Sequence, residues 1–193
     1  FNVWEAIDLA NSHPRVNIHK PGPGVGGHCI AVDPWFIVEQ APVESRLITV
    51  ARNINQFTPH YVVSAISNIV KDIDEPVLTL LGLTYKENTD DMRESPSLII
   101  ATALKQKGYH LKLYDPFVKQ QMEGKVNTIE EAVTGSDCVI ILTAHEEFKK
   151  IDFSQLKDLL KTKMVFDTRN IFNKDNIKSL GINYIPIGST GYR

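Results

Sequence analysis

The sequence has few cysteines, no long hydrophobic run and no basic leader at its start. Its two cysteines, Cys29 and Cys138, lie far apart and offer no disulfide framework, so we expect the protein to reside in a reducing compartment. No stretch of about 18 apolar residues is present, which predicts that no helix spans a membrane. The first residues lack the apolar block of a signal peptide, so the sequence predicts a cytoplasmic protein.

Neither sign of charge dominates the chain. The 21 basic and 23 acidic residues are spread along it and leave a formal net charge of -2. No basic stripe exists to follow a nucleic-acid backbone or an anionic membrane, so we expect a small-molecule partner and no nucleic acid. The residues also predict no metal site. With 193 residues and 42% apolar content, the chain is long enough to bury a full core in one or two domains.

The chain starts within a regular element. Residues 1–12 have no initiator methionine and place Val3, Ile7 and Ala10 on one face of an amphipathic helix. We therefore expect the sequence to be a fragment of a longer protein.

A glycine- and proline-rich loop holds the first cysteine. Residues 21–29 contain four glycines and two prolines, which excludes a regular element. A lone cysteine is usually a small buried hydrophobe, but the glycine-rich polar setting of Cys29 favours a reactive thiol that a ligand can approach closely. Asp33 and Pro34 predict the N-cap and first position of a short helix, and a functional role for Asp33 can coexist with capping. Cys138 lies in an apolar run and is predicted to be a buried residue of a strand.

Residues 44–71 have apolar side chains at steps of three and four and are predicted to form one long helix. Pro59 is expected to kink or divide it. Such a stripe needs a partner surface, and a second copy of the chain would provide it. We expect a homodimer through this helix.

From residue 76 short apolar runs alternate with amphipathic segments of helical length. This alternation predicts an α/β domain with a Rossmann-like parallel sheet over residues 76–193, preceded by a helical region over residues 1–75. Gly82 is the only glycine between Asp74 and Lys107, so the usual pyrophosphate fingerprint is missing and a different nucleotide is expected. Strands are predicted at 77–83, 109–115, 138–142, 164–167 and 182–187, and helices at 96–107, 128–134, 153–160 and 174–180.

The loop ending in Cys29, with an aspartate four residues later, resembles the UDP-glucose/GDP-mannose dehydrogenase superfamily. Residues 44–71, including residues 51–55, look like that family's central dimerisation helix, and residues 82–96 resemble its second signature. Residues 13–18 and 29–36 are most similar to its UDP-N-acetyl-D-mannosamine dehydrogenase branch. The fold that the resemblance implies is a Rossmann-like UDP-binding domain preceded by part of a central helical domain.

The resemblance also implies an activity. A UDP-sugar is oxidised at C6 by four electrons, with two NAD, through a thioester on the catalytic cysteine. Cys29 would carry this covalent chemistry and Asp33 would orient or deprotonate water. The resemblance also implies that Arg93 contacts the cofactor and that Arg15 binds the substrate of the other subunit of the dimer. The remaining substrate-binding residues that it implies are Gly24, Gly26, Gly27, Lys86 and Arg169.

One part of the family pattern is missing. No Gly-x-Gly-x-x-Gly follows an N-terminal strand, so the NAD-binding domain is expected upstream of Phe1, and the chain alone is expected to be inactive. The alternatives are a UDP-glucose or UDP-N-acetylglucosamine 6-dehydrogenase, and a non-catalytic UDP-binding or dimerisation fragment. A redox-sensing role is disfavoured because no resolving cysteine lies nearby.

Overall fold

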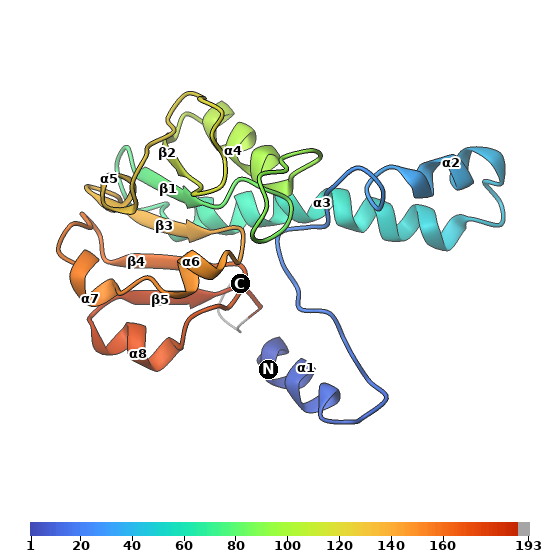
Figure 1. Ribbon diagram of the computed structural model, residues 1–193, viewed down its shortest axis with the longest axis horizontal. Helices are drawn as coiled ribbons and strands as arrows, with labels where there is room; N and C mark the ends of the chain where they lie inside the picture. The colour runs from blue at the N-terminus through green and yellow to red at the C-terminus, as the bar shows by residue number, and fades with distance from the viewer. Residues whose placement is uncertain (189–193) are drawn as a thin grey trace.

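The computed structural model describes residues 1–188, and its centre is a five-stranded sheet with helices on both faces (Figure 1). The strand order is β2-β1-β3-β4-β5, and every pairing is parallel. All the carboxyl ends of the strands therefore meet at one edge of the sheet, where such folds bind ligands. The predicted α/β fold with a parallel sheet is confirmed. The strands are β1 (Val77–Leu81), β2 (His110–Tyr114), β3 (Cys138–Ile141), β4 (Met164–Asp167) and β5 (Asn183–Pro186).

Alternation along the strands divides the core in two. Leu80 of β1 and Ile140 of β3 belong to one buried cluster, and Leu81 and Ile141 belong to the other. Successive strand residues point to opposite faces, so an apolar run such as β3 is buried on both sides. The sheet is consequently the middle of three layers.

Each face has its own helices. The first is covered by α3 (Arg46–Ile69) and α4 (Pro96–Gln106), and the second by shorter helices. Ser95 caps α4, because its hydroxyl accepts a hydrogen bond from Ser97 N. The predicted helix at 153–160 ends early, and the one-turn helix at 146–149 was not predicted. The short helices are α5 (Ile129–Val133), α6 (Glu146–Lys149), α7 (Phe153–Leu156) and α8 (Lys174–Ser179).

Helix α3 runs through Pro59 without a break, so the expectation that Pro59 divides it is wrong. A proline inside a helix costs about 3 kcal/mol, but the half that follows is held by packing in the core. The first half of α3 extends away from the sheet as an arm, with α2 (Asp33–Gln40) packed alongside it (Figure 1). Although α3 is 24 residues long, none of the helices in residues 1–188 is apolar enough over a sufficient length to cross a membrane.

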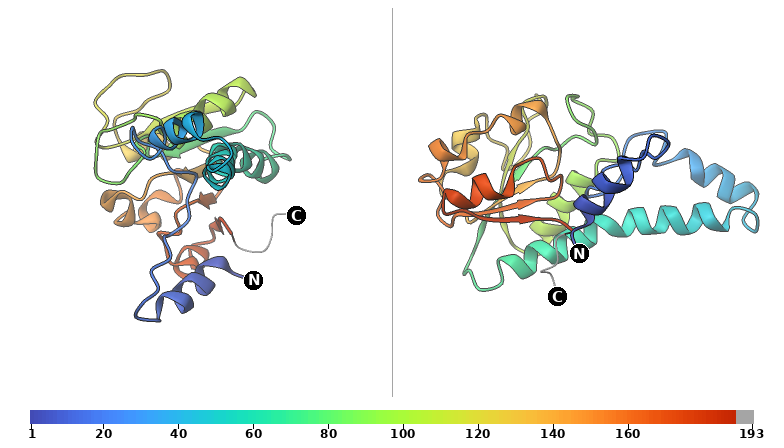
Figure 2. Two further views of the ribbon diagram at one scale, coloured as in Figure 1. Left: turned by 90° about the vertical axis from the view of Figure 1, so that its right-hand side faces the viewer. Right: turned by 90° about the horizontal axis from the view of Figure 1, so that it is seen from below.

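The first helix, α1 (Val3–Asn11), lies beside the carboxyl end of β5 (Figure 2). The Trp4 indole is buried there and donates a hydrogen bond to Ile187 O at 2.7 Å. An extended segment leads from α1 back across the molecule to the cysteine loop. The two ends of the described chain are thus tied together.

Candidate active site

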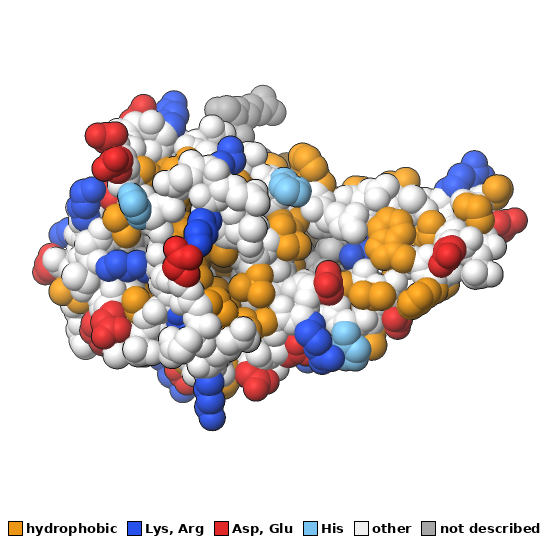
Figure 3. Space-filling view, turned by 90° about the horizontal axis from the view of Figure 1, so that it is seen from above, with side chains coloured by type: hydrophobic (Ala, Val, Ile, Leu, Met, Phe, Trp, Pro, Cys, Tyr) orange, Lys and Arg blue, Asp and Glu red, His pale blue; other side chains and the backbone are white. Residues whose placement is uncertain are grey.

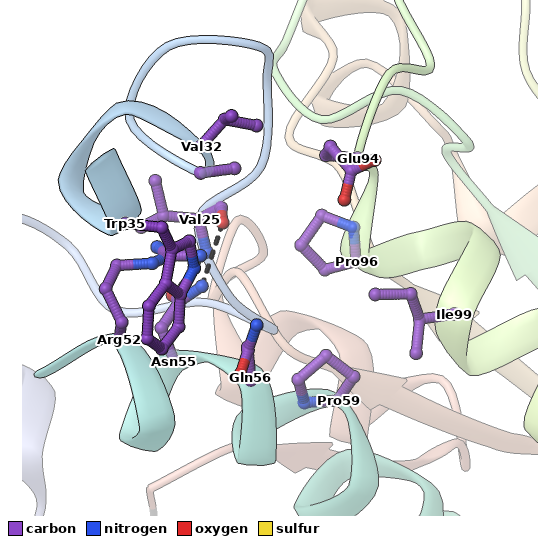
Figure 4. Close-up of a pocket in the computed structure, with 11 residues that line it drawn as sticks. Val25, Val32, Trp35, Arg52, Asn55, Gln56, Pro59, Glu94, Pro96 and Ile99 are labelled. Atoms are coloured by element: carbon purple, nitrogen blue, oxygen red, sulfur yellow. Dashed lines mark hydrogen bonds between the residues drawn. The ribbon is translucent and has the colours of Figure 1, made fainter. Parts of the chain in front are cut away.

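The loop that carries Cys29 is held from two sides. The Asn55 side chain on α3 accepts a hydrogen bond from Val25 N at 2.8 Å and donates one to Val25 O at 2.9 Å (Figure 4). From the other side, Gly27 N donates to Arg93 O at 3.1 Å. The long helix and the segment after β1 therefore fix the backbone of the loop just before the cysteine.

Close packing explains the glycines of this loop. A β-carbon at Gly26 would collide with Glu94 O, and one at Gly27 would lie 2.9 Å from the Tyr85 ring. Gly24 and Gly27 also have positive φ angles, a conformation that glycine adopts without strain. The close approach that we expected from a ligand is thus made here by residues 85–96. Binding of substrate by Gly24, Gly26 and Gly27 stays a prediction.

The Cys29 thiol is exposed to solvent, and a charged pair lies in the adjoining segment. Arg93 forms a bidentate contact with Asp91, with Nε–Oδ1 at 3.0 Å and Nη2–Oδ2 at 2.6 Å. These hydrogen bonds lower the pKa of the Asp91 carboxyl to about 2. The same contact with Asp91 raises the pKa of Arg93, and Cys29 lies close enough to interact with the guanidinium. Arg93 is therefore a permanent positive charge within electrostatic reach of Cys29.

The structure corrects one local role. Asp33 is not the N-cap of α2, because the cap is Val32 and Asp33 is the first helical residue. Asp33 N donates to Cys29 O at 2.8 Å. This bond joins residues four apart, as in an α-helix, so the turn before α2 leads directly into the helix. The Asp33 carboxylate is exposed at the positive end of the α2 dipole. It remains available for another role.

A pocket of about 610 Å³ opens at the carboxyl edge of the sheet. Arg169, from the turn after β4, lines it together with Lys149 of α6. The extended segment that leads to the cysteine loop adds His19 and Lys20, and Glu87 is its acidic residue. This cluster, which we call the basic pocket, suits an anionic ligand.

Arg169 connects the basic pocket to the cysteine loop. Its backbone N–H donates to Asp167 Oδ1 at 2.8 Å, which fixes the turn after β4. Its guanidinium lies against Gly22, where any side chain would collide with it. Burial lowers the pKa of Arg169, and the nearby carboxylates of Glu87 and Asp167 oppose that effect. The guanidinium is therefore a partly desolvated cation at the edge of the sheet.

Two predicted substrate-binding residues lie outside the basic pocket. Lys86 is exposed on the turn after β1, next to Glu87, and it is not among the residues that line the pocket. Arg15 is exposed just after α1, where its backbone N–H donates to His13 Nδ1 at 3.2 Å. The structure thus brings Arg169 toward the cysteine loop without bringing Arg15 to the same place.

A second pocket, of about 290 Å³, lies behind the cysteine loop (Figure 4). Arg52 lines it and is 8% exposed, and its Nε atom has no hydrogen-bond partner within residues 1–188. The glycine spacing Gly22-x-Gly24-x-x-Gly27 also occurs at this loop, but it follows no strand and packs against protein. No group of three His, Cys, Asp or Glu residues is arranged to hold a metal in the described part of the chain.

Sequence reasoning missed His19, Lys20, Lys149 and Arg52. Lys149 had the clearest signal, because it comes soon after the carboxyl end of a buried strand. His19 and Lys20 lie on an irregular segment, where no periodic pattern indicates which side chains face a pocket.

Two domains of one known family match most of the chain. The UDP-binding domain of the UDP-glucose/GDP-mannose dehydrogenase family matches residues 79–174, and the central domain of the same family matches residues 1–57. A UDP-N-acetyl-D-mannosamine dehydrogenase from Methanocaldococcus jannaschii is 44% identical over 97% of this chain and 44% of its own length. An NDP-N-acetyl-D-galactosaminuronic acid dehydrogenase from Ralstonia solanacearum is 44% identical over 89% of this chain and 41% of its own length.

A solved structure agrees with these matches. The UDP-D-ManNAc dehydrogenase from Pyrococcus horikoshii superposes with a TM-score of 0.86 and 35% identity, over 97% of this chain and 44% of that one. The chain thus spans less than half the length of the relatives that it matches. The cysteine motif and the second signature both lie inside the matched regions. The chain therefore belongs to the UDP-glucose/GDP-mannose dehydrogenase family.

Proposed function

We propose that this chain supplies the catalytic cysteine and the nucleotide-sugar site of an NAD-dependent 6-dehydrogenase that converts UDP-N-acetyl-D-mannosamine to its uronate. Residues 1–75 would form the cysteine-loop and dimerisation region, and residues 76–193 the UDP-sugar domain. The observation that carries the proposal is the contact between Arg169 and Gly22, which joins the basic pocket to the cysteine loop. A nucleotide-sugar held by one would present its sugar toward the other.

The basic pocket has the chemistry that a diphosphate needs. A guanidinium binds phosphate oxygens through two parallel hydrogen bonds, and lysines add point charges. Arg169 provides the first kind of contact and Lys20 and Lys149 the second. We include Lys86 on the adjoining turn as a further contact of the nucleotide-sugar, and Arg15 as a residue lent to the site of a second copy.

The chemistry at the cysteine requires a thiolate. Loss of a first hydride and a proton from the C6 alcohol would give an aldehyde. Cys29 Sγ adds to this aldehyde and forms a C–S bond, which gives a thiohemiacetal. Loss of the second hydride from C6 turns this into a thioester. Water, oriented or deprotonated by Asp33, then attacks the carbonyl carbon, and the C–S bond breaks to release the carboxylate and the Cys29 thiolate. Sulfur suits both steps because it adds to aldehydes and leaves readily from acyl groups.

Among residues 1–188, the candidate contact for NAD is Arg93. Arg93 is exposed near Cys29 and already paired with Asp91, so it can contribute a positive charge toward the cofactor. The glycines of the cysteine loop offer no open cradle for a pyrophosphate, because Gly22 packs against Arg169 and Gly24, Gly26 and Gly27 pack against residues 85–96. When bound, NAD accepts the two hydrides of the oxidation.

The sugar is inferred from the matched relatives. The mannosamine dehydrogenase and the galactosaminuronic acid dehydrogenase are each 44% identical to this chain. Both are named for an N-acetylated sugar, which supports an N-acetylated sugar as the substrate here. Comparing turnover of UDP-N-acetylmannosamine, UDP-N-acetylglucosamine and UDP-glucose by an active enzyme that contains this chain would decide among them.

Calorimetry on the 193-residue chain tests the nucleotide site. We expect UDP to bind measurably and NAD to bind far more weakly, because the basic pocket matches a diphosphate and the described residues include no dinucleotide cradle. Uridine, which lacks the diphosphate, is the control and should bind at least about tenfold more weakly than UDP. NAD binding more tightly than UDP would overturn the assignment.

We also propose that the chain dimerises through the arm. Apolar side chains at steps of three and four lie exposed along the first half of α3, and others are exposed on α2 (Figure 3). A contiguous exposed apolar surface marks an interaction site, and a second copy carries the same surface. The exposed apolar residues of the arm, which together we call its apolar face, are Phe36 and Ile37 on α2, Val43 in the connection, and Leu47, Val50, Ile54, Phe57 and Tyr61 on α3.

Charge placed in the middle of this face should prevent dimerisation. We expect Ile54→Glu, at a side chain that is 65% exposed in the single chain, to fold normally and to raise the dimer dissociation constant at least about tenfold, because burying a carboxylate at an apolar interface is costly. Sedimentation velocity at several concentrations measures it. Leu9→Glu on α1, where the leucine is 76% exposed, is the matched control and should leave the dimer intact. A wild-type chain that stays monomeric at high concentration would contradict the proposal.

A further inference from the structure

Three side chains form a buried polar cluster at the carboxyl edge of the sheet, beside the turn that carries Lys86. Thr84 follows β1, Asp115 follows β2 and His145 follows β3. The exposed fractions of these residues are 1%, 3% and 0%. The proposed mechanism gives none of them a role, yet burying three polar side chains together is costly unless each is hydrogen-bonded.

The hydrogen bonds define the protonation state of the His145 ring. Asn88 N donates to His145 Nδ1 at 2.9 Å, so Nδ1 must be an acceptor without a proton. On the other side, Nε2 lies 3.1 Å from Asp115 Oδ2 and 3.3 Å from Thr84 Oγ1. The Thr84 hydroxyl already donates to Lys86 O at 2.8 Å, and therefore its oxygen accepts from the ring.

Asp115 is the acceptor that holds the Nε2 proton. Its carboxylate also accepts hydrogen bonds from Leu83 N at 2.7 Å and Phe117 N at 2.9 Å. Burial by itself raises the pKa of Asp115, but the hydrogen bonds from His145 and from these backbone groups outweigh it and leave the pKa below its ordinary value. The imidazole is therefore neutral, with its proton on Nε2, because a second proton on Nδ1 would face the Asn88 N–H.

This arrangement secures both sides of Lys86. Before it, Thr84 is tied to His145 and donates to the carbonyl of Lys86 itself. After it, Asn88 is held through its N–H by His145, while its side-chain oxygen accepts from Glu146 N at 3.0 Å. Asn88 has a φ of 57°, a conformation that the backbone keeps only where its surroundings demand it.

Two aromatic rings keep the imidazole in place. The centroid of Phe117 lies 4.9 Å from that of His145, and the centroid of Phe148 lies 5.1 Å away in an edge-on arrangement. A ring flip would exchange the two nitrogens only by pushing against these neighbours. The donor and acceptor of His145 are thus presented in one orientation.

We propose that His145, as a neutral imidazole with its proton on Nε2, is a positioning residue that fixes the turn of residues 84–88 and thereby sets the affinity for the nucleotide-sugar through Lys86. The proposal rests on the proposed function in one respect, namely the contact of Lys86 with the nucleotide.

Two variants test the two ring nitrogens of His145 separately. His145→Asn places an oxygen near the position of Nδ1, so it keeps the acceptor for Asn88 N and loses the donor to Asp115. His145→Gln places an amide nitrogen near Nε2 and loses the acceptor for Asn88 N. Both side chains are smaller than histidine, so both leave space between the same aromatic rings, and each is the control for the cavity made by the other.

The readouts do not depend on turnover. In the wild-type chain we expect imidazole ¹⁵N shifts of the neutral Nε2–H form, with hydrogen exchange of the Asn88 amide protected. In His145→Gln the Asn88 amide should exchange about tenfold faster and the dissociation constant for UDP should rise by about tenfold, the effect of one lost hydrogen bond. In His145→Asn the Asn88 amide should stay protected and UDP affinity should stay closer to wild type.

The outcomes are distinct. Shifts of an imidazolium or of the Nδ1–H form, or equal Asn88 exchange in both variants, would overturn the positioning role. Faster Asn88 exchange in His145→Gln with unchanged UDP affinity would overturn its link to the nucleotide. If wild type binds no UDP while the ¹⁵N shifts and the exchange results are as expected, the proposed function of the basic pocket fails and the link to affinity fails with it, but the assignment of the ring survives.

Discussion

Cys29→Ser should lower acid production by an active enzyme that contains this chain by at least about a thousandfold. A serine hydroxyl is almost fully protonated at neutral pH, so it adds poorly to the aldehyde, and its ester is a weaker acyl donor than a thioester. Turnover is measured as NADH formation. Binding of UDP should stay within about twofold of wild type, because the basic pocket does not include the cysteine.

Cys138→Ser is the matched control. Cys138 is fully buried on β3, and burial raises the pKa of its thiol to about 12, so it has no thiolate to offer at neutral pH. Turnover should persist, while the free energy of unfolding in urea falls by about 1–3 kcal/mol because a hydroxyl is placed in an apolar core. Wild-type turnover by Cys29→Ser, or loss of turnover in Cys138→Ser at full folding, would exclude the proposed thioester route.

In the same enzyme, Asp33→Asn should accumulate the acyl-enzyme, visible by intact mass.

Arg169→Ala should weaken UDP binding by about 10- to 100-fold, since a charge-assisted hydrogen bond is worth about 1.5–3 kcal/mol. The guanidinium is partly desolvated and its backbone turn is fixed by Asp167, so its contact with a phosphate would be stronger than that of an exposed lysine. Calorimetry with UDP measures the change. Arg169→Lys should recover part of the affinity, because a point charge replaces the bidentate group.

Lys163→Ala provides the control for Arg169. Lys163 precedes β4 at the opposite edge of the sheet and pairs with Asp158, away from the basic pocket. It removes one positive charge from the chain, as Arg169→Ala does, and should leave UDP affinity unchanged. Equal losses in the two variants would mean that only net charge matters, and the basic pocket would then not be the nucleotide site.

The regular elements were largely predictable from local patterns. The five strands begin within one residue of their predicted starts, because a short apolar run between turn residues identifies a buried strand. Their ends were less certain, and the helix over residues 153–156 is shorter than the pattern indicated. Pro59 does not divide the helix, since packing of α3 in the core outweighs the local cost of a proline, and a kink there stays a prediction.

The candidate site was predictable only in part. The loop of Cys29 is identified by its glycines and prolines, which are local signals. The stripe on α3 was also visible, but its two halves have different neighbours. Leu47 is 81% exposed, whereas Ile66 is fully buried against the sheet, and periodicity alone does not distinguish a core partner from solvent.

The sequence by itself determined the fold class, the parallel sheet and the irregular glycine-rich loop of Cys29, because helical periodicity, strand alternation and backbone restrictions act over a few residues. Only the tertiary structure placed Arg169 against Gly22, Lys149 in the basic pocket and His145 between Asp115 and Asn88. These residues are far apart along the chain and meet because the carboxyl ends of parallel strands converge at one edge. Which side chains meet there depends on how the loops pack, and that is decided by burial and hydrogen bonding across the whole fold.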